Sequence, residues 1–259
     1  MNYFIFNGHS SAEFGIRINK KSVYGAPKRD ASLISIPGRN GDIIYSNKKY
    51  SNVNISYTCF VSSKSKKELA DRLTLIKNWL YKECDSYHAL TDTYEPNFRK
   101  IAIFNNKLDI TDEVSKIGSF TITFSCKPLR YLIAGLDAQS YTDVAHLHNT
   151  YITPSKPYIK IYGNGDGRLI LTNGDGVHVW NISSIDEYIE LDSELMSAFK
   201  DTELKNNLVS GEGFPELIEG QNSIRFEGNI TRIDIIPRWV SLWFLYFLVQ
   251  HPPHLITLV

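Results

Sequence analysis

The chain has 259 residues, more than a typical single domain, so two domains of ordinary size are expected. Lys plus Arg and Asp plus Glu both number 28, and the resulting net charge of zero excludes the broad basic surface typical of nucleic-acid-binding proteins. The first residues, MNYFIFNGHSS, lack a basic segment followed by an apolar one, which argues against secretion through a signal peptide.

Residues 1–134 mix predicted strands with one clear helix. In SFTITFSCKP, Phe120, Ile122 and Phe124 alternate with Ser and Thr, so one face of this strand is predicted to be core. In SKSKKELADRLTLIKNWLYK, apolar residues recur at helical spacing, and Ser65 with Glu68 can form a capping box at the start. The strands predicted in this half cover residues 3–6, 15–19, 33–36, 42–45, 53–61, 100–105 and 118–126.

The stretch IPGRNG predicts a hairpin. Pro-Gly suits one turn and Asn-Gly suits a strand reversal, so residues 34–36 and 43–45 are expected to pair. Gly38, Arg39, Asn40 and Gly41 would then form the tip, with Arg39 free to reach a partner. We therefore treat these four residues as a candidate interface.

No nucleophile elbow, Walker loop, HExxH motif or dinucleotide fingerprint occurs in the sequence. Five carboxylates keep a glycosidase open as an alternative, although sequence alone cannot place two of them across a cleft. They are Asp92, Glu95, Asp109, Asp112 and Glu113. We expect no catalytic residue, no cofactor and no metal site.

The three cysteines, Cys59, Cys84 and Cys126, are an odd number without CxxC spacing. Buried, reduced thiols are expected, in keeping with synthesis in a cytoplasm. His146 and His148 could lie on one side of a strand, but no third ligand is near, so surface or packing roles are favoured over a metal pair.

From residue 135 the helix signal nearly vanishes and short strands alternate with Gly, Asn, Asp and Pro turns, as in a sandwich or jelly roll. The tetrapeptide Asn-Gly-Asp-Gly occurs twice, at 164–167 and 173–176, and both copies are predicted to be the corners of a three-stranded meander. A calcium or phosphate loop is disfavoured, because the carboxylate spacing and a following helix are missing.

Aromatic residues of this half offer a second hypothesis. Trp180, Tyr188 and Tyr162 could stack on sugar rings if they shared an exposed face, although core positions are commoner for such residues in a sandwich. The run VSLWFLYFLV, residues 240–249, is the most apolar in the chain and about half the length of a membrane-spanning helix, so no membrane insertion is expected.

Several segments together resemble the distal tail proteins of long, non-contractile-tailed (siphovirus) bacteriophages. In the first half these are FNGHSSAEFGIRI, APKRD, IPGRNGDIIY and NVNISYTCFV; in the second half they are PYIKIYGNGDGRLILTNGD, IELDSELMSAF and FPELIEGQNSIRFEGNITRIDIIPRWVSL. The series covers nearly the whole chain in order. Family members commonly end soon after a segment like PRWVSL, so residues 243–259 are kept apart as an apolar tail of doubtful status.

The resemblance implies a mainly β protein of the β-rich α+β class. Residues 1–134 would be a ring-forming, tail-tube-like β-sandwich or split barrel with one helix, and residues 135–242 a galectin-like or jelly-roll β-sandwich similar to carbohydrate-binding modules. The implied function is that of a non-enzymatic virion structural protein, the hub of the phage tail tip or baseplate.

The resemblance also implies partners. Six copies would form a homohexamer around a channel that DNA only passes through, joining the tail-tube protein to the tail-associated lysin or fibre protein and, in some phages, to receptor-binding or other baseplate proteins. The protein would be made and assembled in the bacterial host cytoplasm and act in host adsorption. The alternative is a carbohydrate-binding protein that recognises host cell-wall glycan through its C-terminal sandwich.

Overall fold

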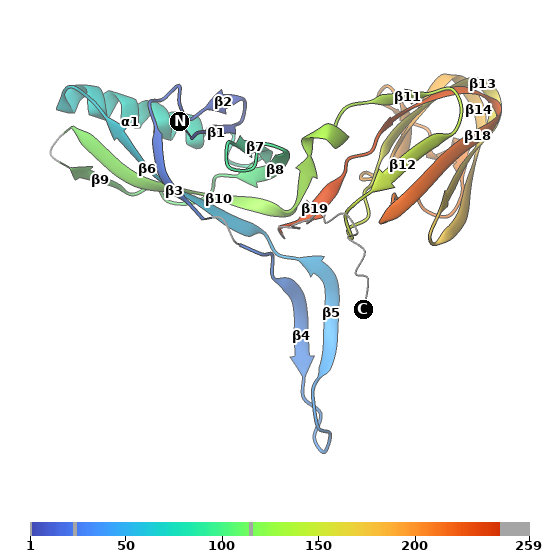
Figure 1. Ribbon diagram of the computed structural model, residues 1–259, viewed down its shortest axis with the longest axis horizontal. Helices are drawn as coiled ribbons and strands as arrows, with labels where there is room; N and C mark the ends of the chain where they lie inside the picture. The colour runs from blue at the N-terminus through green and yellow to red at the C-terminus, as the bar shows by residue number, and fades with distance from the viewer. Residues whose placement is uncertain (1, 23–24, 114–115, 244–259) are drawn as a thin grey trace, which may run out of the picture.

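The computed structural model describes residues 2–22, 25–113 and 116–243 (Figure 1). Two large antiparallel sheets lie at opposite ends of the molecule, and a two-stranded hairpin projects from the region of the first. One α-helix is present among the described residues, α1 (Lys66–Leu80). The expected mainly β fold class is therefore confirmed.

The first sheet contains nine strands within the described residues. Its longest strands alternate between buried and exposed positions, as the Ser and Thr spacing of SFTITFSCKP predicts, so one face is available to form a core. In spatial order the strands are β2 (His9–Ser10), β1 (Phe4–Phe6), β7 (His88–Asp92), β8 (Phe98–Ile103), β10 (Ile117–Leu132), β6 (Val53–Ser62) and β3 (Arg17–Lys21), with β9 (Ile110–Glu113) and β19 (Val240–Leu242) paired to β10.

Helix α1 covers this core. Its start is capped by Ser65, whose hydroxyl accepts the backbone N–H of Glu68 at 3.2 Å, while the Glu68 carboxylate accepts the N–H of Lys64 at 3.0 Å. The apolar stripe buries Leu69, Ile76, Trp79 and Leu80. The predicted helix and the Ser65 cap are thus confirmed, although Glu68 reaches back one residue further than a capping box requires.

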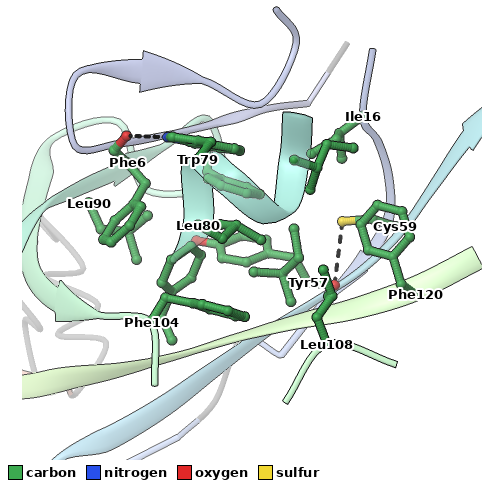
Figure 2. Packing of buried hydrophobic residues seen from close by; sticks show 14 of the residues in the cluster. Phe6, Ile16, Tyr57, Cys59, Trp79, Leu80, Leu90, Phe104, Leu108 and Phe120 are labelled. Carbon is green, nitrogen blue, oxygen red and sulfur yellow. Dashed lines mark hydrogen bonds between the residues drawn. The ribbon is translucent and has the colours of Figure 1, made fainter. Parts of the chain in front are cut away.

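The core beneath the helix is rich in aromatic rings (Figure 2). Trp79 stacks on Phe14 with ring centroids 4.4 Å apart, and its indole N–H donates to the carbonyl of Phe6 at 3.2 Å. Phe124 packs against Phe6 at 4.6 Å and Phe4 at 5.4 Å. Each such ring contributes roughly 1.5–3 kcal/mol through burial, so the aromatic cluster dominates the stability of this half.

The second sheet contains eight strands of the described chain and encloses a separate apolar core. The three longest strands contribute core residues along most of their length, so they bend around the core and form the two layers of a sandwich. The strands are β11 (Gln139–Tyr141), β12 (Ala145–Asn149), β13 (Tyr158–Asn173), β14 (Gly176–Asp192), β15 (Ser197–Lys200), β16 (Glu203–Leu204), β17 (Val209–Ser210) and β18 (Gly220–Ile236), and short 3-10 turns cover Ile133–Gly135 and Asn206–Leu208.

The first Asn-Gly-Asp-Gly copy is not the corner predicted from sequence. It lies inside β13, where the pairing register shifts between Gly165 and Gly167, and only the second copy forms the turn between β13 and β14. Glycine is required both just before this copy and within it: a Cβ on Gly163 would lie 2.2 Å from the carbonyl oxygen of Asn229, and Gly165 has a φ of +103°. The first copy therefore bends a continuous strand.

The chain returns to the first sheet at its end. β19 pairs with the last part of β10, Leu242 opposite Leu129, and Trp243 packs against the first core. The first sheet therefore includes a strand that follows the second sheet in sequence. The division at residues 134 and 135 stays a prediction, and the tail lies, except for Trp243, outside the described residues.

Candidate assembly interface

The predicted hairpin is formed by β4 (Arg29–Ile34) and β5 (Ile43–Tyr50). Ile34 pairs with Ile43 and Leu33 with Ile44, and the N–H of Arg39 donates to the carbonyl of Ile36 at 3.1 Å to close the first turn. Gly38 and Gly41 have φ values of +81° and +84°, which glycine adopts without strain. The four predicted tip residues, Gly38, Arg39, Asn40 and Gly41, are all exposed.

The hairpin projects away from both large sheets (Figure 1). It forms a sheet of its own, and nearly every side chain along it is exposed or only partly covered. Many of these side chains are apolar. The exposed fractions are 68% for Leu33, 49% for Ile34, 38% for Ile36, 38% for Ile43, 69% for Ile44, 61% for Tyr45 and 38% for Tyr50.

Such a surface is unusual for a chain that functions alone. A two-stranded hairpin is marginally stable in water without a third strand or a packed face, and a contiguous apolar patch marks an interaction site. The turn signals in the sequence indicate only the polar tip, whereas the structure adds the exposed apolar side chains along both strands. We therefore define the assembly hairpin as residues 29–50.

Of the aromatic residues suggested for sugar stacking, Tyr162 and Tyr188 share a face, with ring centroids 6.2 Å apart, but Trp180 does not join them. Trp180 is only 2% exposed, in the core of the second sheet. Tyr188 pairs with Tyr162, next to the core pair Ile161 and Ile189, so it lies on the outer face. Trp180 and Tyr188 cannot flank one ligand.

The side chain of Tyr188, on the outer face of the sheet, is in contact with neighbouring side chains. The ammonium of Lys160 lies 3.6 Å from the ring centroid, and the hydroxyl donates to Asp201 at 2.6 Å. That hydrogen bond, followed by partial desolvation, raises the pKa of Tyr188 to about 12. This cation–π arrangement leaves the face nearest Lys160 unavailable to a sugar ring.

Two of the carboxylates considered for catalysis belong to a buried ionic network in the first half. Asp92 accepts from Lys100 at 2.7 Å and from the Tyr57 hydroxyl at 2.6 Å, and Lys21 lies 3.0 Å away. Glu95 contacts the same two ammonium groups at 2.6 and 2.8 Å, and also Arg130. These carboxylates are paired within the protein, an arrangement suited to holding strands together.

The network lowers the pKa values of its two carboxyl groups and raises that of Lys21, so each shift favours the charged form. Burial alone would raise the pKa of Asp92, but the charges of Lys100 and Lys21 outweigh it and hold that pKa well below its usual range. The pKa of Glu95 is lowered for the same reasons, burial being opposed mainly by Lys100. Burial lowers and Asp92 raises the pKa of Lys21, and the net direction is upward. Asp92, Glu95 and Lys21 are therefore held in their charged forms.

No pattern of neighbouring residues predicts this network, although the sequence contains one signal of it. Lys100 alternates with Ala102 and leads to Phe104, all three fully or almost fully buried, so a lysine stands at an inward strand position. A buried lysine requires a carboxylate partner, and Asp92 is the residue at the end of the neighbouring strand β7. Asp109 does not join it and is exposed beside Lys107. The side chains of Asp112 and Glu113 lie outside the described part.

The thiols and histidines carry no site of their own. Cys59 and Cys126 are buried and free, and burial raises the pKa of each thiol to about 12, but Cys84 is free and exposed, contrary to the expectation of burial. His146 and His148 are both exposed on β12. Within residues 2–22, 25–113 and 116–243, no group of three potential ligands could hold a metal ion, and no helix is long and apolar enough to cross a membrane.

Comparisons with known proteins agree with this geometry. Residues 10–126 match the model of the phage tail protein RIFT-related domain. The Dit protein of phage SPP1, described as a paradigm of the hub adsorption apparatus in phages that infect Gram-positive bacteria, superposes with a TM-score of 0.71 at 12% identity, over 91% of this chain and 98% of that one.

Two further matches are weaker. They are chains of the phage p2 baseplate in its activated conformation, with calcium and with strontium, at TM-scores of 0.44 and 0.46 and identities of 10% and 11%; each covers 91% of this chain and 97% of the other. Curated protein sequences gave no significant match. Residues 10–126 therefore resemble the phage tail protein RIFT-related domain, and 91% of the chain shares the fold of the Dit protein of phage SPP1.

Proposed function

We propose that this chain is a non-enzymatic hub protein of the phage tail tip, which assembles through the hairpin of residues 29–50 into a homohexameric ring. The single observation that carries the proposal is the projecting hairpin with seven exposed apolar or aromatic side chains. The match of residues 10–126 to a phage tail protein domain supports the location in a virion tail. The fold match to a hub protein of the adsorption apparatus supports the role.

The physical argument concerns what could cover the hairpin. Leu33 and Ile44, a directly paired couple, are 68% and 69% exposed, so their burial would stabilise a complex by roughly 1–2 kcal/mol each. A second copy of the chain is the occupant we favour. A hairpin that packs on a different surface of the next copy makes a heterologous contact, and such contacts close into a ring when the rotation per subunit is right.

Within this proposal the ring surrounds a channel through which DNA only passes. One side of the ring docks on the tail-tube protein, and the other holds the tail-associated lysin or fibre protein, together with receptor-binding or baseplate proteins where a phage has them. The protein is synthesised and assembled in the bacterial cytoplasm. The projecting second half remains available for contact with the host surface.

The test compares the mass of the purified protein by light scattering, with negative-stain images of the same fraction, for the wild type and the double variant Leu33→Ser with Ile44→Ser. We expect rings in the wild type, alone or with added tail-tube protein. The double variant should keep its circular dichroism spectrum and melting temperature, because both side chains are exposed, but remain monomeric.

Val177→Ser supplies a matched control. Val177 is 64% exposed at the start of β14, so apolar surface of the same kind, although less of it, is lost on a different hairpin. This variant should assemble like the wild type. A wild-type protein that stays monomeric with tail-tube protein present, or a double variant that still forms rings, would contradict the proposed hub.

A further inference from the structure

The dipeptide Asn-Gly occurs four times in the sequence, and the four copies lie in different structural surroundings. They begin at Asn7, Asn40, Asn164 and Asn173. Asn-Gly is the dipeptide most prone to spontaneous loss of the side-chain amide, because glycine has no Cβ to hinder attack by its own backbone nitrogen. In an unfolded chain the four copies would react alike, so the fold decides which of them is modified.

The reaction needs two free groups that can approach each other. The backbone nitrogen of the glycine attacks the side-chain carbonyl carbon of the asparagine. As this C–N bond forms, the bond to the amide nitrogen breaks, and ammonia leaves with the proton of the glycine N–H. Water then opens the cyclic succinimide at either carbonyl and gives aspartate or isoaspartate. A hydrogen bond to the asparagine side chain, or a paired backbone, keeps the two atoms apart until the site opens.

The two copies in the second sheet are held by their side chains. Asn164 lies within β13, and its side-chain oxygen accepts the backbone N–H of Glu187 at 3.2 Å. The side-chain oxygen of Asn173 accepts the backbone N–H of Asp175 at 3.0 Å. In each copy, the carbonyl group that must be attacked is fixed in a hydrogen bond.

The copy at Asn7 is held through its backbone. Asn7 and Gly8 form the turn between β1 and β2, and the flanking residues Phe6 and His9 pair with each other. The N–H of Asn7 also donates to the carbonyl of Ala89 at 3.3 Å. The attack would require this paired turn to open first, and local opening costs free energy in a folded protein.

Asn40 differs from the other three copies. It is exposed at the tip of the assembly hairpin, which projects from the molecule (Figure 1). Within the described chain, no hydrogen bond involves the Asn40 side chain or the N–H of Gly41. A Cβ placed on Gly41 would have no atom within 4 Å, so the surroundings are open. Both reacting groups are therefore free, and no packed neighbour restrains their approach.

We propose that Asn40 is a site of spontaneous deamidation, which replaces a neutral amide at the tip of the assembly hairpin by a carboxylate. Either product adds a negative charge next to Arg39, and isoaspartate also adds a methylene group to the backbone. The modification goes beyond the hub role and needs no ring. Its consequence, weaker assembly of aged protein, rests on the proposed function, because a carboxylate that enters an interface loses its hydration.

The first experiment incubates the purified full chain at mildly alkaline pH and follows each Asn-Gly copy by peptide mapping with mass spectrometry, which distinguishes amide from acid. Asn40 should deamidate at least about tenfold faster than the other three copies, because those react only from locally opened states. The same chain unfolded in urea is the control. There the four rates should become similar, because only the fold distinguishes the copies.

Two variants connect the modification with assembly. Asn40→Gln keeps a neutral amide, but its longer side chain forms the cyclic intermediate far more slowly, so it should assemble like fresh wild type before and after incubation. Asn40→Asp carries the product carboxylate from the start and should need about tenfold more protein to form rings, as one uncompensated charge at a contact predicts. Light scattering measures both. Neither change should alter the melting temperature, because Asn40 is exposed.

Two results would overturn the assignment of the site. One is deamidation of Asn40 no faster than that of the other copies in the folded chain, and the other is an equal preference for Asn40 in urea. Equal assembly of Asn40→Asp and Asn40→Gln would overturn the consequence for assembly. A wild type that forms no ring even with tail-tube protein contradicts the proposed hub and this consequence, whereas the peptide map decides the site by itself.

Discussion

Replacing Asp92 by Asn tests whether the buried ionic network holds the first sheet together. The change keeps the size of the side chain and the acceptor for the backbone N–H groups of Tyr94 and Glu95, each at 2.9 Å. It removes the negative charge shared by Lys100 and Lys21 at 2.7 and 3.0 Å. Both ammonium groups are at most 1% exposed, so water cannot replace the lost partner.

The expected cost is large. Breaking a buried ion pair by removing one partner typically destabilises a protein by about 3–5 kcal/mol, and here one carboxylate, Glu95, would be left to balance the buried ammonium groups of Lys21 and Lys100. That is a large fraction of the roughly 5–15 kcal/mol that holds a domain folded. With a denaturant dependence of about 2 kcal/mol per molar urea, the unfolding midpoint should fall by about 2 M. Tryptophan fluorescence and circular dichroism at pH 7 would measure it.

Asp109→Asn is the matched control. Asp109 also pairs with a lysine, Lys107, at 2.8 Å, but the two side chains are 75% and 83% exposed. Surface pairs of this kind contribute little, so no change of midpoint is expected. An Asp92→Asn protein that unfolds within about 0.5 M urea of the wild type would refute the argument that burial makes this network important.

The remaining predictions concern stability at low pH, the contact between Arg238 and Asp192, and the bend within β13. The folded-state pKa values of Asp92 and Glu95 are lowered, so the stability that these carboxylates contribute is complete above about pH 5 and is lost on acidification. The difference in free energy of unfolding between the wild type and Asp92→Asn should therefore narrow by up to about 1.4 kcal/mol per pH unit below about pH 3.9. Arg238→Ala removes two hydrogen bonds to Asp192, at 2.7 and 2.9 Å, and should lower the free energy of unfolding by about 1.5–3 kcal/mol, measured in urea. Gly163→Ala places a Cβ against the backbone of Asn229 and should lower the free energy of unfolding by about 1–3 kcal/mol. In the control Gly118→Ala the nearest contact is 3.4 Å, so this variant should unfold like the wild type. Equal melting temperatures for the two variants would contradict the argument that the bend in β13 requires glycine.

The parts of the fold that follow from local pattern were predictable. Alternation in SFTITFSCKP predicts β10 and its buried face, helical spacing predicts α1, and the two turn signals in IPGRNG predict the hairpin. Each depends only on residues close together in the chain. The local sequence pattern is therefore sufficient to predict such elements.

The parts that depend on distant contacts were not predictable in this way. The first Asn-Gly-Asp-Gly copy has the composition of a turn, but the close approach of Asn229 turns it into a bend within a strand. The apolar side chains of the hairpin are exposed because no other part of the described chain packs against them, and local sequence does not reveal this.

The return of β19 to the first sheet has a consequence for how this molecule can change. The chain leaves the first sheet after Leu132 and comes back at Trp239, and these two residues are joined by a backbone hydrogen bond of 2.8 Å, as are Gly135 and Arg238. The whole second half is thus an insertion whose entry and exit are adjacent. Since insertions are tolerated where the two ends of the inserted unit meet, a different module could be grafted at this junction while the hairpin and first core stay as they are.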